Sequence, residues 1–131
     1  MKNLHEKLER FQKEKGWEIS TENSGDSRES LLLNHMLLTT EIAEIAEELR
    51  KMMNYEYEMI EKGLDKEEAF LFAKREVSEE IGKEIADCIA YLCKFATFFE
   101  RDIEEDILNK LQEINNRTKT NLQKRMKEEV K

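Results

Sequence analysis

Acidic side chains are the residues of this chain whose spacing could do chemistry. Aspartate and glutamate make up 30 of the 131 residues, so acids three positions apart arise often by chance and mostly mark solvated helix faces. Two groups differ from this background because both lie among apolar residues at helical spacing. The first group contains Glu41, Glu44 and Glu48, and the second contains Glu80, Glu84 and Asp87. The members of each group share one helix face, because they are three, four or seven positions apart.

These carboxylates could bind a divalent metal ion if their two helices form a hairpin. Positions equally distant from a turn at Leu64 then face each other, which pairs Glu41 with Asp87, Glu44 with Glu84, and Glu48 with Glu80. Two like charges about 4 Å apart repel by about 4 kcal/mol at an effective dielectric near 20, so the cluster requires protonation, solvation or cations. Oxygen ligands alone favour a hard ion, Mg²⁺ first and then Mn²⁺ or Ca²⁺. The alternative is a polar seam whose acids turn outward to lysines.

Four helices are predicted to position the acids. The pattern Asp-x-x-Glu occurs at Asp26, Asp65 and Asp102, each time before an apolar-periodic stretch, which indicates capped helix starts. Gly16 and Gly63 are placed to end the preceding helices. The predicted helices cover about residues 2–15, 27–62, 66–100 and 103 to the early 120s. Because the link between the second and third helices is very short, we expect them to form an antiparallel hairpin.

Composition favours a single all-α domain. The chain has no proline and four glycines, and its charged and hydrophobic residues reach 40% and 39%. A β-sandwich or barrel needs frequent turn residues that this sequence lacks. We therefore predict one domain, residues 1–131, with a four-helix bundle-like fold, a long central hairpin and a core at about 28–117. Residues 118–131 form a basic tail, either a solvated, frayed end or a flap that meets an anionic ligand.

Charge and cysteine content set expectations about partners and location. The formal net charge of −8 argues against a protein that coats nucleic acid. We find no secretory signal and no apolar run that could span a bilayer, so we expect no membrane association. Cys88 and Cys93 lie about 140° apart on one helix and are expected to be buried reduced thiols, which favours the cytoplasm. Because the remaining helices cannot cover the hairpin, we predict a homodimer or a dimer of dimers.

Two segments resemble the MazG-like all-α nucleoside triphosphate pyrophosphohydrolases. They read Leu38-Thr-Thr-Glu41-Ile-Ala-Glu44-Ile-Ala-Glu47-Glu48-Leu49 and Lys83-Glu84-Ile-Ala-Asp87-Cys-Ile-Ala-Tyr91-Leu92. The stretch from Asp102 to Arg117 is similar to the last core helix of that family, so the resemblance covers about residues 28–117. It departs from the family at Thr40, where a further acid is usual, and in the longer connection between the two segments.

The resemblance implies Mg²⁺-dependent cleavage of an NTP or dNTP substrate to the monophosphate and pyrophosphate. The metal ligands would be Glu41, Glu44, Glu84 and Asp87, with Mn²⁺ as a substitute ion. The candidates for phosphate contacts are Lys110, Asn116 and Arg117. Trp17, in the connector after the first helix, could stack on the nucleobase or cap the core. The general base stays open, with Glu48 and Glu80 as candidates.

Two alternatives to this function are open at the level of sequence. A non-catalytic helical interaction or regulatory module would use its acids only for solubility. A phosphoribosyl-ATP pyrophosphohydrolase, which belongs to the same superfamily, would share the site but act on another substrate. The preferred base and sugar are not specified by these motifs.

Overall fold

The computed structural model describes residues 1–129, and these residues form four α-helices and no strand. The helices are α1 (Lys2–Lys15), α2 (Ser24–Glu61), α3 (Lys66–Phe98) and α4 (Ile103–Glu129). The prediction of an all-α fold is therefore confirmed. The last two positions of the predicted tail, 130 and 131, lie outside the described residues.

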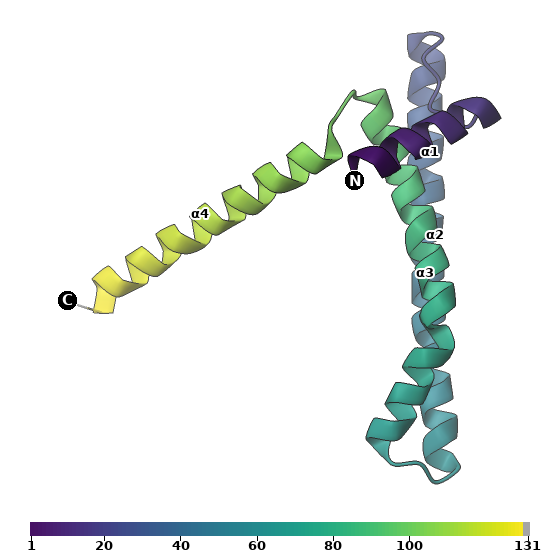
Figure 1. Ribbon diagram of the computed structural model, residues 1–131, viewed down its shortest axis with the longest axis vertical. Helices are drawn as coiled ribbons and strands as arrows, with labels where there is room; N and C mark the ends of the chain where they lie inside the picture. Colours follow the sequence, from purple (N-terminus) through teal and green to yellow (C-terminus); the bar gives the residue numbers. More distant parts are fainter. Residues whose placement is uncertain (130–131) are drawn as a thin grey trace.

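Helices α2 and α3 form the long axis of the molecule. The loop at residues 62–65 reverses the chain, and α3 returns along α2 (Figure 1). Gly63 occupies this loop with φ at 103°, a left-handed conformation that glycine adopts without steric cost. Toward α2, α3 buries the small apolar side chains Ala69, Ala73, Val77 and Cys88. Small residues on the shared face let the two helices lie close together, which brings their polar side chains into range of one another.

Helix α1 packs across the end of the hairpin that is distant from the loop, against α3. Gln12 is buried, and its Nε2 donates a hydrogen bond to the carbonyl oxygen of Ala90 at 2.9 Å. His5 Nε2 lies 2.9 Å from Thr97 Oγ1. These two contacts hold α1 beside the half of α3 that follows the acidic segment.

The helix starts follow the capping predictions in two of three cases. Asp65 accepts hydrogen bonds from the backbone N–H groups of Glu67 and Glu68 at 2.8 and 3.1 Å. Asp102 accepts one from the N–H of Glu105 at 3.1 Å. The predicted caps at Asp65 and Asp102 are thereby confirmed, because each carboxylate satisfies a backbone donor of the first turn.

The predicted cap at Asp26 is wrong. Helix α2 begins earlier, at Ser24, and Asn23 is its N-cap. The Asn23 side chain accepts from the N–H of Asp26 at 2.8 Å and donates to the Asp26 carboxylate at 2.9 Å. Asp26 therefore lies within the first turn of α2. Its negative charge is stabilised there by the positive end of the helix dipole.

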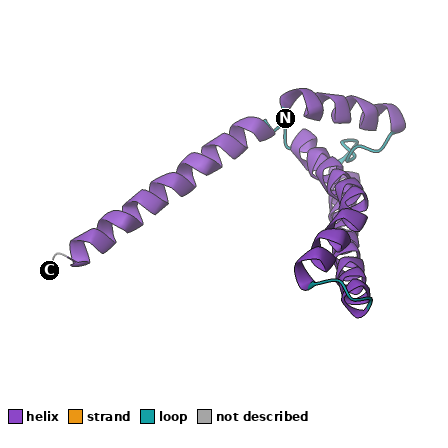
Figure 2. Cartoon of the chain, turned by 60° about the horizontal axis from the view of Figure 1, so that its bottom comes forward, coloured by secondary structure: helices purple, strands orange, loops and turns teal. Residues whose placement is uncertain are grey.

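Helix α4 projects away from the other three helices (Figures 1 and 2). It continues to Glu129, so residues 118–129 are helical and the prediction of a frayed tail is wrong for them. Its two apolar residues in this segment, Leu122 and Met126, are four positions apart, a spacing that continues the helical pattern beyond the predicted end. The chain enters α4 through Glu100, whose φ is 53°, and an ion pair between Arg101 and Asp106 at 2.7 Å follows.

Both cysteines are free and buried, as predicted. Cys88 lies on the α2-facing side of α3, and burial, followed by the nearby carboxylates, raises the pKa of its thiol. Burial alone raises the pKa of the Cys93 thiol. Within residues 1–129, no helix has the length and apolar content that crossing a membrane requires.

Candidate metal centre

Three carboxylates from two helices meet at the hairpin. Glu41 on α2 and Glu84 and Asp87 on α3 each offer an oxygen, and these oxygens all lie within 4.8 Å of one another. Glu84 and Asp87 are one helical turn apart, and the reversal at residues 62–65 brings Glu41 beside them. Within residues 1–129, no other group of carboxylate, thiol and imidazole ligands is this compact. We name Glu41, Glu84 and Asp87 the acidic triad.

The acidic triad carries uncompensated negative charge. Burial raises the pKa of Glu41, and the charges of Asp87 and Glu44 add to this effect. Burial also raises the pKa of Glu84, followed by the charges of Asp87 and Glu44. None of the three acids forms an ion pair within the described part of the chain. A bound cation would therefore relieve the repulsion, since no lysine or arginine does so.

Three of the four predicted metal ligands thus lie together, and the fourth lies beside them. Glu44 is exposed and does not belong to the triad, but its charge acts on both Glu41 and Glu84. Carboxylate oxygens without nitrogen or sulfur ligands are the donors that Mg²⁺ prefers. The donor set therefore fits a hard divalent ion.

Glu48 and Glu80 differ from the triad because each is paired with a lysine on its own helix. Glu48 is buried, and its carboxylate lies 3.0 Å from Lys51 Nζ. Glu80 is exposed and lies 3.1 Å from Lys83 Nζ. The interpretation as seam acids that turn to lysines describes these two residues. Their candidacy as general base stays a prediction.

A pocket of about 310 Å³ borders the acidic triad. Glu41 and Asp87 line it together with the aromatic residues Tyr91, Trp17 and Phe11. Trp17 is half exposed and meets Phe11 edge to face, with ring centroids 5.7 Å apart. An aromatic ring that is supported on one side and open on the other suits stacking against a planar ligand. The structure therefore places Trp17 at the predicted site, beside the triad.

Lys94 also lines this pocket, and the sequence analysis missed it. Its Nζ lies 3.1 Å from Asn34 Oδ1 and 4.7 Å from the ring centroid of Tyr91. Burial lowers the pKa of the Lys94 ammonium, against a smaller opposing effect of Glu18. The signal was present in the sequence, because Asp87, Tyr91 and Lys94 follow each other at helical spacing on one face.

The other predicted substrate residues lie on α4, apart from the triad in the single chain. Lys110 and Arg117 pair with Glu113, at 3.5 and 3.6 Å respectively. Asn116 lies on the same surface of α4, with Arg117 and Glu113. Because α4 projects away from the hairpin (Figure 1), these residues do not reach the acidic triad of their own chain. Their contact with phosphate stays a prediction.

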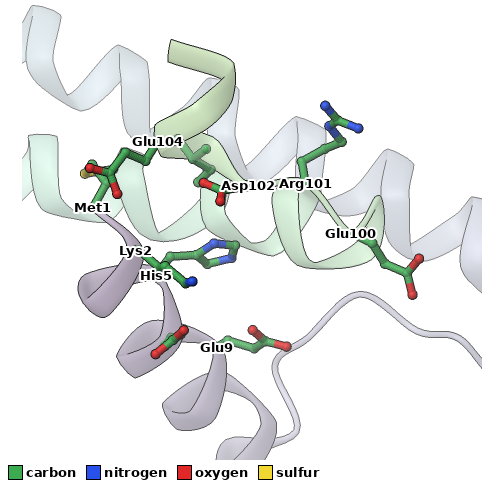
Figure 3. A pocket seen from close by; sticks show the side chains of 10 residues that line it. Met1, Lys2, His5, Glu9, Glu100, Arg101, Asp102 and Glu104 are labelled. Atoms are coloured by element: carbon green, nitrogen blue, oxygen red, sulfur yellow. The ribbon is translucent and has the colours of Figure 1, made fainter. Parts of the chain in front are cut away.

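A second pocket, of about 270 Å³, lies between the start of α1 and the link from α3 to α4. Figure 3 shows its side chains, which come from both segments and carry both signs of charge. Lys2, His5 and Arg101 are interspersed there with acids such as Glu9 and Asp102. Its acids form no compact ligand group, so this pocket lacks the feature that distinguishes the triad.

Comparisons of the chain with protein-family models, with curated proteins and with solved structures found no match. The function must therefore be inferred from the site. Its features are a compact carboxylate triad without a paired cation, an adjoining aromatic pocket and one partly buried lysine in the wall of that pocket.

Proposed function

We propose that the chain is a Mg²⁺-dependent nucleoside triphosphate pyrophosphohydrolase that releases a nucleoside monophosphate and pyrophosphate. The observation that carries the proposal is the acidic triad, whose three oxygens lie within 4.8 Å at the edge of an aromatic pocket. A polyphosphate is too anionic to bind carboxylates directly, so a site of this kind requires a divalent ion between them. The adjoining pocket is apolar enough to take the nucleobase.

The acidic triad would hold the ion. Glu44 would assist, because it is close enough to Glu41 for its charge to act there. When bound, Mg²⁺ supplies charge neutralisation at the phosphates and a more acidic water. The triad residues come from two helices that pack along their length, so their oxygens are held together before any ligand arrives. Such preorganisation reduces the entropy cost of binding.

The residues of the pocket would bind and orient the nucleoside. Trp17 and Tyr91 offer ring faces, and Lys94, next to Tyr91, offers N–H donors. Since lysine has no acceptor, the ligand must present an oxygen or nitrogen lone pair to it. Glu48 or Glu80 would accept the proton of the attacking water once released from its lysine, and the geometry does not choose between them.

We further propose that the enzyme is a cytoplasmic homodimer or dimer of dimers, with the hairpin as the centre of its bundle. The described residues bury few large apolar side chains, and many such side chains are exposed on α2, α3 and α4. A chain with so small a core gains stability by association.

The decisive experiment measures pyrophosphate release from a panel of NTPs and dNTPs, with phosphoribosyl-ATP included, in the presence of Mg²⁺ or Mn²⁺. We expect Glu84→Gln and Asp87→Asn each to lower kcat/KM by roughly 10²–10³-fold, because a several-kcal/mol electrostatic contribution is lost. Glu79→Gln is the matched control. It removes an exposed acid from the same helix, about 140° around the axis from Glu84.

Binding can be followed separately from turnover through Trp17, the only tryptophan of the chain. We expect Mg²⁺ with a non-hydrolysable nucleotide to change its fluorescence, and Asp87→Asn to abolish this change. If no nucleotide yields pyrophosphate and none changes the Trp17 signal, the enzyme proposal is wrong. The alternative of a non-catalytic interaction module, which the exposed apolar surfaces favour, would then stand.

A further inference from the structure

Helix α4 lacks a partner within its own chain, although its sequence is that of a packed helix. Its exposed apolar side chains recur at helical spacing and form the α4 stripe, which contains Ile107, Leu111, Ile114, Leu122 and Met126. The helix has 27 residues and makes no extended contact with α1, α2 or α3. An isolated helix of this kind is only marginally stable in water, so a surface outside the single chain must cover the stripe.

The hairpin exposes an apolar face of matching character. It contains Ile85 and Leu92 on α3, Phe99 directly after α3, and on α2 Ile42, Leu49, Met53 and Ile60. On each helix these residues lie about 90° around the axis from the residues that face the other helix. Because α2 and α3 run in opposite directions, the two offsets open on the same side. We name this surface the apolar hairpin face.

The α4 stripe and the apolar hairpin face are continuous with each other. They meet where α3 ends and α4 begins, in an open apolar pocket of about 700 Å³ lined by Phe95, Phe99, Ile103 and Ile107. The left-handed turn at Glu100 and the Arg101–Asp106 ion pair direct α4 away from the hairpin at this point. The hairpin and α4 thus enclose an angle whose two inner surfaces are apolar. Another apolar element can fit between them.

Charge favours the hairpin of another copy as that element. Between Ile107 and Lys127, α4 carries six basic residues and one acid, whereas α2 carries nine acids and three basic residues. An arm that is basic on its polar side is attracted to the acidic hairpin of a second copy, and two copies satisfy each other by the same contact.

From these observations we propose that α4 is an exchanged arm: in a symmetric dimer each copy lays its α4 stripe on the apolar hairpin face of the other. Asp87 and Lys94 are offset around α3 in the opposite direction from Leu92, so docking on this face leaves the pocket beside the acidic triad open. The proposal concerns an interface only and does not depend on the proposed enzymatic activity.

The test begins with the mass of the full chain in solution, measured by size-exclusion chromatography with light scattering. We expect at least a dimer. Leu111→Glu places a charge in the α4 stripe and Leu92→Glu places one in the apolar hairpin face, and each should weaken the dimer by about thirtyfold or more. Asn109→Glu adds the same charge about 160° around the axis of α4 from Leu111 and should leave the mass unchanged. Far-UV circular dichroism establishes that each variant stays helical.

Exchange is distinguished from other modes of pairing by a photo-crosslinker at position 111, in a mixture of isotopically light and heavy chains. We expect crosslinks that join a light α4 to a heavy hairpin. Three outcomes would overturn the proposal: a monomeric parent chain, crosslinks from α4 only to its own hairpin, or a dimer that survives both Leu111→Glu and Leu92→Glu.

Discussion

The hairpin and α4 are both long amphipathic helical regions, but they obtain their stability in different ways. α2 and α3 pack along their length through small side chains such as Ala73 and Val77. α4 packs along no other described helix (Figure 2). Its apolar stripe is exposed. The hairpin is therefore stabilised by contacts within the chain, whereas we propose that α4 is stabilised by association.

This difference bears on where a site can form. The acidic triad requires three carboxylates held within 4.8 Å of one another against their mutual repulsion, and only packed helices can hold them so. Lys110 and Arg117 carry charge as well, but their helix is not positioned by the rest of its chain. We therefore propose the hairpin as the place of the metal site and α4 as the element through which copies associate.

The largest effect is expected in amide hydrogen exchange, which compares the local stability of the hairpin with that of α4. In the Leu111→Glu variant, amides around Ala73 and Val77 should be protected at least about a hundredfold more than those of α4, because α4 then opens without disturbing the hairpin. Mass spectrometry of peptides from both regions measures this ratio. Equal protection in both regions would show that α4 packs on its own chain.

A smaller effect is expected in the coupling of metal to stability. Mg²⁺ at about 100 times its dissociation constant stabilises a folded chain by about 2.7 kcal/mol, which raises Tm by roughly 8 °C for a protein of this size. Glu84→Gln should have a higher Tm than the parent without metal, because it removes repulsion, and should lose the response to Mg²⁺. Glu79→Gln should respond as the parent does. If Mg²⁺ raises the Tm of Glu84→Gln as much as that of the parent, the acidic triad is not the metal site.

The contributions of Glu41 in the hairpin and Asp106 in α4 to stability are expected to change with pH in opposite directions. The pKa of Glu41 is raised above its ordinary value of 4.5, mainly by burial, so the folded state binds its proton more tightly and metal-free stability falls as pH rises through that window. The pKa of Asp106 is lowered from 3.8, mainly by its hydrogen bond from Arg101, so its stabilisation is lost as pH falls.

Denaturation in a chelator between pH 3 and pH 8, for the parent, Glu41→Gln and Asp106→Asn, measures both effects. The stability difference between parent and Glu41→Gln should fall with rising pH, and that between parent and Asp106→Asn should rise. Parallel differences would mean that the two carboxyls share one kind of environment.

The smallest expected effect concerns the start of α3. Asp65→Ala removes the acceptor for two backbone N–H groups and should cost about 1 kcal/mol of hairpin stability, or roughly 3 °C in Tm. Asp26→Ala should cost less, because Asn23 and not Asp26 caps α2. Thermal denaturation of the two variants under the same conditions tests this order.

Much of the candidate site could be predicted because helical spacing is regular. The distance of Glu41 and Asp87 from the turn at Leu64 was enough to set them opposite each other, and the structure places both in the triad. Helical spacing places Lys94 on the face of Asp87 and Tyr91, but its contact with Asn34 on α2 depends on the tertiary structure. Asn34 is far from Lys94 in sequence, and no local pattern joins the two.

The sequence by itself determined the all-α class, the caps at Asp65 and Asp102, and the faces on which the acids lie, because these depend on local backbone geometry and side-chain period. Only the tertiary structure decided that Lys94 reaches Asn34, that α1 brings Trp17 beside Asp87, and that α4 leaves the hairpin. These outcomes depend on packing between segments distant in the chain and on a single left-handed turn at Glu100, which helical periodicity does not encode.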